Sequence, residues 1–190
     1  MSGAAAYSLT ASWFHWAVAL PLVGCVGTVL KAQDAPKEEK GKWMFRHKSL
    51  GLLTAGVVAP RVAYRIMSSS TAYNVAKLEG ASGLENILSK IVHYSLYGFM
   101  LVMPATGIAM GYYGGKGLPF FYTTIPGIVK TDQNKASTGA IAKQSFQIHK
   151  QVGVYGKYLV PVHVGAAFVH FARGHRIFFR VNPFRGPSPH

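Results

Sequence analysis

The sequence predicts an all-α integral membrane protein, folded as a bundle of four transmembrane helices. Two observations lead to this fold class. Of the 190 residues, 49% are apolar and 13% aromatic, whereas only 14% are charged, a balance that is more apolar than in most soluble domains. The apolar residues also gather into four runs that approach or reach the length of a bilayer-spanning helix. We therefore expect a single membrane domain over residues 1–190.

The first and third apolar runs are the clearest. Trp13 to Leu30 and Ile91 to Tyr113 contain no Asp, Glu, Lys or Arg, and each is long enough for a helix that crosses about 30 Å of hydrocarbon. We expect helices at residues 12–31 and 91–113. Cys25, the single cysteine, is interpreted as a small packing residue of the first helix.

The second and fourth runs are weaker, and their helices are expected at residues 47–66 and 149–171. Both are interrupted by charged side chains, namely Lys48, Arg61, Lys150 and Lys157. Weak hydropathy together with polar groups inside a span suggests helices that line an interior site. Each of the four runs carries one proline, which transmembrane helices tolerate because neighbouring helices help to satisfy the freed backbone groups.

The net charge of +14 is carried mainly by the segments between the apolar runs. Basic loops of a membrane protein meet anionic lipid headgroups or an acidic protein partner, so membrane lipid is an expected partner and nucleic acid is not. The two sides carry similar numbers of Lys and Arg, so the positive-inside rule does not choose an orientation. Residues 114–127 (GGKGLPFFYTTIPG) and the C-terminal tail, residues 172–190, are expected to lie in the membrane interface.

Two histidines lie fourteen positions apart (163 − 149) in the fourth run. At about 100° and 1.5 Å per residue, His163 falls roughly 40° around the helix from His149 and about 21 Å further along it. In an antiparallel bundle His163 then returns to the depth of His15, near the start of the first helix, while His149 shares the depth of His47 at the start of the second. The topology therefore predicts two pairs, His15 with His163 and His47 with His149.

A single histidine in an apolar helix is more often a hydrogen-bonded packing residue than a ligand, but two depth-matched pairs are stronger evidence. Neutral imidazole offers one ring nitrogen to a metal, and opposed histidines can bind a haem iron axially inside a helix bundle. Zinc would require three or four clustered ligands, more than one depth supplies. Each of the four predicted helices carries a pair of glycines. Small residues of this kind allow ordinary close packing of helices, and they also leave space beside the helices for a flat macrocycle such as haem. The predicted fold is thus a four-transmembrane-helix bundle that holds two haems.

The residues that carry these features resemble the prokaryotic-type cytochrome b561 family, which includes the cytochrome b subunits of membrane-bound nickel–iron hydrogenases. The resemblance covers nearly the whole chain, and its specific element is the pair of histidines fourteen positions apart. The matching segments are WFHW (13–16), RHKSLGLL (46–53), PRVAYR (60–65), HYSLYGFMLVMPATGIAMGY (93–112) and IHKQVGVYGKYLVPVHVGAAFVHF (148–171).

The resemblance implies two b-type haems, with ligands from the first, second and fourth helices, and electron exchange with quinone. Carried over by position, the ligands are His15 and His163 for one haem iron and His47 and His149 for the other. The resemblance also implies that His93 lies at a quinone or proton-transfer site.

Arg61 and Arg65 end the second helix on the same side as His93. Their guanidinium groups could pair with haem propionates or with a quinone headgroup, and an anchor at the lipid headgroups is an equal alternative for each. Lys157 departs from the expected pattern, because an ammonium at mid-membrane is costly unless it is paired. The sequence offers no partner for it, which points to a neighbouring subunit.

The predicted function is that of a di-haem electron carrier in an energy-transducing membrane, either the bacterial inner membrane or the mitochondrial inner membrane. It would exchange electrons with quinone and with a protein donor or acceptor, as a quinone-linked oxidoreductase or as the electron-transfer subunit of one. The alternative is an accessory structural subunit of a respiratory complex that retains haem without turnover. A haem-free transporter is disfavoured, because no acidic residue lies inside a predicted span.

Overall fold

The computed structural model describes residues 8–67 and 80–185, apart from the side chain of Arg65. The described part contains six helices and one β-hairpin. The helices are α1 (Leu9–Asp34), α2 (Lys37–Met67), α3 (Gly83–Tyr113), α4 (Lys135–Gly156), α5 (Leu159–Ala172) and α6 (Ile177–Val181), and the hairpin consists of β1 (Leu118–Phe120) and β2 (Thr123–Ile125).

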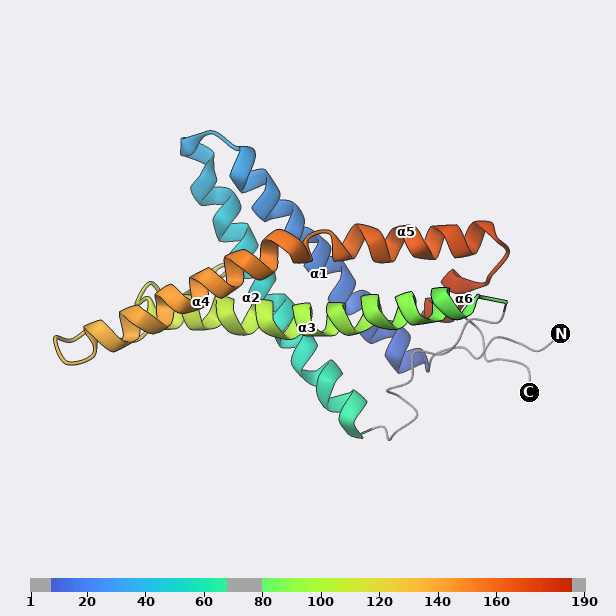
Figure 1. The fold of residues 1–190 in the computed structure, drawn as a ribbon. Helices are drawn as coiled ribbons and strands as arrows, with labels where there is room; N and C mark the ends of the chain where they lie inside the picture. The colour runs from blue at the N-terminus through green and yellow to red at the C-terminus, as the bar shows by residue number, and fades with distance from the viewer. Residues whose placement is uncertain (1–7, 68–79, 186–190) are drawn as a thin grey trace.

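The long helices form two groups that cross each other (Figure 1). Helices α1 and α2 pack closely along each other, α3 packs along α4 and also touches α5, and α2 contacts α3 where the groups meet. A small apolar cluster fills this crossing and is formed by Val18 of α1, Val58 of α2 and Met100 of α3. The crossing of the two groups therefore lies at the middle of α1, α2 and α3.

Helix α2 begins ten residues before the predicted start at residue 47. Only Ala35 and Pro36 separate it from α1, and the backbone N–H of Ala35 donates to the Lys31 carbonyl, so the first helix ends in a tight turn. Glu38 and Glu39 occupy the first turn of α2, where negative charge is favoured by the helix dipole. The charged segment before residue 47 was expected to be a loop, and that expectation is wrong because these residues have their own helix start.

Helix α3 also begins before the predicted residue 91. Ser82 caps it in a capping box: its hydroxyl accepts from the Glu85 backbone N–H, and the Glu85 carboxylate accepts from the Ser82 N–H. This arrangement satisfies two of the N–H groups that the first turn of a helix leaves without partners. The apolar run is therefore the C-terminal part of a longer helix, which ends at Tyr113 as predicted.

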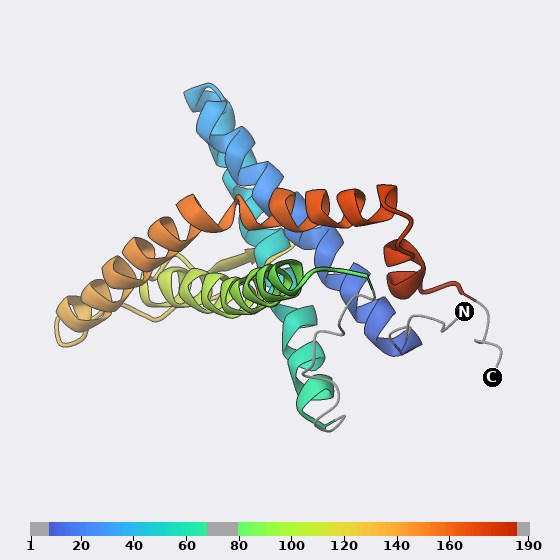
Figure 2. The same cartoon turned by 45° about the vertical axis from the view of Figure 1, so that its right-hand side comes forward.

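The fourth predicted helix, residues 149–171, is divided between two helices. Helix α4 starts at Lys135 and ends at Gly156, and α5 starts at Leu159. Figure 2 shows the change of direction between them. Pro161 lacks an N–H and its ring crowds the carbonyl four residues earlier, that of Lys157. The interruption lies at this residue, so we attribute it to Pro161.

The connection between α3 and α4 contains the hairpin. Strands β1 and β2 pair antiparallel, with Phe120 opposite Thr123. The buried Ser49 of α2 anchors the turn, because its hydroxyl accepts from the Phe121 N–H at 3.0 Å and lies 3.4 Å from the Pro119 carbonyl oxygen. The segment expected only to rest in the interface is thus an ordered hairpin packed on α2.

Three helical segments of the described chain are long and apolar enough to cross a membrane: Leu9–Asp34, Gly83–Tyr113 and Lys135–Ala172. Their surfaces are apolar and mostly exposed, with Leu20, for example, 67% exposed, as a helix that faces lipid requires. Helix α2, with its charged first turns, is not among the three. The fourth crossing therefore remains a prediction.

Gly156 allows a close contact between α4 and the Phe99 ring of α3. A Cβ at this position would lie 2.1 Å from Cε2 of the Phe99 ring, which is only 5% exposed and has little room to move. We expect Gly156→Ala to lower the free energy of unfolding by about 1–3 kcal/mol, because overpacking forces side chains or backbone to shift. Thermal unfolding in detergent, followed by circular dichroism, measures this change.

Gly165→Ala is the matched control, since a Cβ there has no heavy atom within 4 Å among the described residues. It should leave the melting temperature unchanged or raise it slightly, because alanine favours a helix more than glycine does. Equal melting temperatures for the two variants would mean that the Gly156–Phe99 contact does not limit packing.

Candidate functional site

The structure brings together the rings of both predicted histidine pairs. The ring centres of His47 on α2 and His149 on α4 are 6.1 Å apart, and those of His15 on α1 and His163 on α5 are 6.4 Å apart. We call these the His47 pair and the His15 pair. Each pair joins a helix of the first group to a helix of the second.

The ring of His47 is held by α1. Its Nδ1 lies 2.9 Å from the Cys25 carbonyl oxygen and 3.2 Å from the Cys25 Sγ. A carbonyl oxygen only accepts hydrogen bonds, so Nδ1 must carry the proton, an assignment made from the hydrogen-bond network. In neutral His47 the Nε2 atom therefore carries the lone pair, which is the form that binds a metal ion.

The ring of His149 is held by α3. Its Nδ1 lies 3.0 Å from the hydroxyl oxygen of Thr106. The next residue, Gly107, allows the ring to approach the α3 backbone, because a Cβ there would lie 3.3 Å from the His149 Cε1. Cys25, Thr106 and Gly107 were not singled out for these roles from the sequence, since their contacts depend on the rotation of each helix about its axis.

The His15 pair has a third histidine beside it. The ring centre of His93 on α3 lies 5.1 Å from that of His163, and the His93 Nδ1 lies 2.6 Å from the Ser89 carbonyl oxygen. By the same reasoning, His93 Nδ1 is the donor and Nε2 the acceptor. Arg61 of α2 is close enough for its charge to act on His15 and His163.

Three of the residues predicted on this side, His15, His93 and His163, thus gather with Arg61 at one end of the bundle. Arg65 lies on α2 one turn beyond Arg61, but its side chain is outside the described residues. His170 and His175 have ring centres 5.6 Å apart, and neither belongs to a predicted pair. The candidate site at this end therefore consists of one histidine pair, a further imidazole and a guanidinium.

The two histidine pairs lie at opposite ends of the apolar cluster. On α1, Val18 lies between His15 and Cys25, whose carbonyl holds His47. Ten positions (25 − 15) of an α-helix correspond to about 15 Å. The cluster therefore separates two polar sites with hydrocarbon side chains.

The donor sets fit a haem bound by two axial imidazoles. Imidazole nitrogens bind first-row metal ions at about 2 Å, which keeps the centres of two opposed rings about 6 Å apart. The two measured separations, 6.1 and 6.4 Å, agree with this value. Within the described residues, no group of three or more His, Cys, Asp or Glu side chains could hold a metal ion, whereas axial ligation of haem needs only two.

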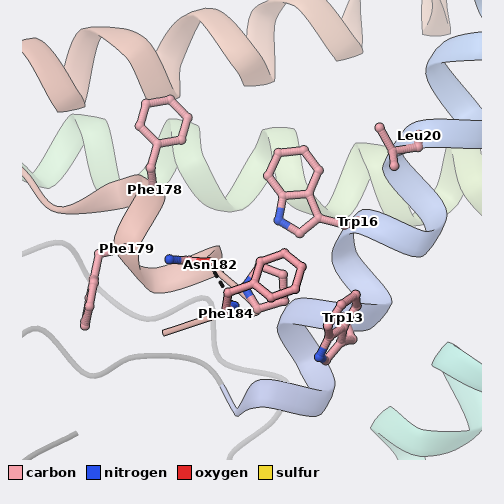
Figure 3. A pocket seen from close by; sticks show the side chains of 8 residues that line it. Trp13, Trp16, Leu20, Phe178, Phe179, Asn182 and Phe184 are labelled. Atoms are coloured by element: carbon pink, nitrogen blue, oxygen red, sulfur yellow. Dashed lines mark hydrogen bonds between the residues drawn. The ribbon is translucent and has the colours of Figure 1, made fainter. Parts of the chain in front are cut away.

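An apolar cavity lies between the first turns of α1 and the C-terminal segment that contains α6 (Figure 3). It has a volume of about 610 Å³ and is lined by Trp13, Trp16, Leu20, Phe178, Phe179, Asn182, Pro183 and Phe184. The indole N–H of Trp16 donates to the Val181 carbonyl at 2.9 Å, and the rings of Trp13 and Phe184 meet edge to face with centres 5.0 Å apart. The predicted interfacial tail is thus packed against α1 as far as its described residues extend, an arrangement that sequence analysis missed.

Lys157, for which the sequence suggested no partner, lies at the interruption between α4 and α5. Its Nζ is 5.0 Å from the centre of the Tyr158 ring. A cation over an aromatic face is stabilised by the ring quadrupole. The chain therefore supplies one aromatic contact for this ammonium, and a neighbouring subunit as its further partner stays a prediction.

Comparison with known protein families relates these observations to a function. The sequence model of the prokaryotic cytochrome b561 family matches residues 6–181, which include all four paired histidines. A search of curated protein sequences finds no significant match. Since the family match covers nearly the whole chain, the protein belongs to the prokaryotic cytochrome b561 family and is a membrane protein that binds haem b and transfers electrons.

Proposed function

We propose that this protein is a di-haem cytochrome that crosses an energy-transducing membrane four times and transfers electrons between quinone and a partner protein. One observation carries the proposal: four histidines from four helices form two pairs, with ring separations of 6.1 and 6.4 Å. At these separations the two imidazoles of each pair would both bind the iron of one haem.

The protein contributes ligation, burial and charge. Haem b, when bound, supplies one-electron redox chemistry. His47 and His149 would hold one haem, and their Nδ1 atoms are bonded to Cys25 and Thr106 on the helices behind them. His15 and His163 would hold the other, with the positive charge of Arg61 nearby. A fixed charge near a redox centre changes its potential.

Quinone exchange is proposed at the His15 end of the bundle, with His93 and Arg61 as the interacting side chains and Arg65 as a further candidate. The bond from Nδ1 to the Ser89 carbonyl places the lone pair of neutral His93 on Nε2, and oxidation of a hydroquinone requires such a base. A guanidinium can donate hydrogen bonds to a quinone oxygen or to a haem propionate. Proton and electron transfer would then occur at one end of the bundle.

Haem content per chain is the first test. We expect two haems b per chain in the detergent-purified protein by the pyridine haemochrome assay, and a b-type spectrum in the difference between the dithionite-reduced and oxidised forms. One haem or none in folded protein would contradict the di-haem proposal. Reduction of both haems by a quinol at a rate compatible with turnover would exclude the accessory structural subunit, whereas haem without quinol reduction would favour it.

A further inference from the structure

The two rings of the His47 pair are held in different ways. The Nδ1 of His47 donates to a backbone carbonyl, that of Cys25, whereas the Nδ1 of His149 meets a side-chain hydroxyl, that of Thr106, beside the Met103 carbonyl of the same helix. We infer that Thr106 is a positioning residue, which fixes the tautomer of His149 and thereby sets the haem affinity and the redox potential on this side. This inference rests on the proposed ligand role of His149.

The hydrogen bonds of Thr106 determine the direction of its bond to His149. The Thr106 hydroxyl oxygen lies 2.6 Å from the Val102 carbonyl oxygen and 3.1 Å from that of Met103. Two oxygens at 2.6 Å repel each other unless a proton lies between them, so the single hydroxyl proton is used within α3. The hydroxyl can then only accept from His149, and Nδ1 must be the donor.

The hydrogen bond that His149 donates to Thr106 affects how His149 would bind a haem iron. An imidazole that donates its second N–H to an acceptor is a more basic ligand and is fixed in orientation. A more basic ligand stabilises ferric over ferrous iron, which lowers the reduction potential. The Cys25 carbonyl provides the same support to His47 and is not removed by a side-chain substitution. Thr106 is therefore the side-chain support of His149 that a point mutation can remove without touching a ligand, while the Met103 carbonyl stays in place.

Three variants test the inference. Thr106→Val keeps the shape of the side chain but removes the acceptor, and Thr106→Ser restores a hydroxyl. Thr54→Val is the matched control, because the Thr54 hydroxyl also donates to the carbonyl four residues earlier, that of Leu50, at 2.8 Å, and has no imidazole partner among the described residues. The measurements are haem retention during dilution and the two midpoint potentials by spectroelectrochemical titration.

We expect Thr106→Val to weaken haem binding at one of the two sites by about 10- to 100-fold and to raise one of the two midpoint potentials. Thr106→Ser should restore both properties, and Thr54→Val should leave them at the wild-type values. Wild-type haem retention and potentials in Thr106→Val would overturn the inference, as would equal effects of Thr106→Val and Thr54→Val.

A measurement without haem separates this inference from the proposed function. In haem-free protein, the nitrogen-15 chemical shifts of His149 distinguish the two neutral tautomers. We expect the Nδ1–H form in the wild type and a larger share of the Nε2–H form in Thr106→Val, in which only the Met103 carbonyl still favours a proton on Nδ1. A mixture in the wild type would overturn the role of Thr106 even if two haems bind. A fixed Nδ1–H form in a protein that binds no haem would contradict the proposed function alone.

Discussion

Replacement of His149 with leucine is expected to reduce the haem content from two per chain to one. The ring of His149 is one half of the His47 pair, and leucine offers no nitrogen to the iron. The other pair should be unaffected, because His15 and His163 lie on the far side of the apolar cluster formed by Val18, Val58 and Met100. Pyridine haemochrome assays and reduced-minus-oxidised spectra of the purified variant provide the measurement.

His47→Leu must give the same spectrum as His149→Leu, since both remove a ligand from one site. His175→Gln is the control, because His175 lies between α5 and α6 and outside both pairs; it should retain two haems. Retention of two haems by both leucine variants would contradict the pairing. A loss of all haem with a normal melting temperature would mean that the two sites are not independent.

The two histidine pairs could be predicted from the sequence because the prediction depends on the rise and twist per residue, which are nearly the same in all α-helices. Rise and twist per residue fix the depth and direction of His163 relative to His149, and the antiparallel order of the helices fixes which histidines share a depth. The structure places the rings of both predicted pairs next to each other, although α4 and α5 are separate helices. Their role as ligands remains a prediction.

Helix ends were predicted less well than helix positions. Hydropathy marks only the apolar part of a helix, whereas the helix continues until a cap or a turn ends it. For this reason α2 starts at Lys37 and α4 at Lys135, well before their apolar runs. Pro21, Pro60 and Pro104 lie inside continuous helices, as expected.

Pro161 behaves differently from the other three prolines. The residues before it include Gly153 and Gly156, and glycine costs about 1 kcal/mol relative to alanine in a helix. Gly51 and Gly56 precede Pro60 at a similar spacing inside the continuous helix α2, so glycine alone does not explain why the helix is interrupted before Pro161. The partners of the histidine Nδ1 atoms on other helices were beyond prediction for another reason: Cys25 and Thr106 make their contacts through helix rotations that hydropathy does not determine.

The His93→Gln variant is expected to bind both haems but to be reduced by quinol about 100- to 10,000-fold more slowly, the usual effect of losing a general base. The Nδ1 of His93 donates to the Ser89 carbonyl at 2.6 Å, so the basic lone pair of the neutral ring is on Nε2. Glutamine can retain a hydrogen bond but cannot accept a proton. Stopped-flow reduction of the haems by a soluble quinol, with haem content measured on the same sample, tests this expectation.

Ser89→Ala is the matched control for His93. It removes a hydroxyl that lies 3.4 Å from the His93 Nδ1 but keeps the carbonyl that holds the ring. A weak hydrogen bond contributes only about 1 kcal/mol. The rate of haem reduction by quinol should therefore stay within a few-fold of the wild-type rate. An unchanged rate in His93→Gln would remove His93 from the reaction. Because its ring lies only 5.1 Å from that of His163, loss of one haem in His93→Gln would instead place His93 in the haem site, as a support of His163 and not as a proton acceptor for quinol.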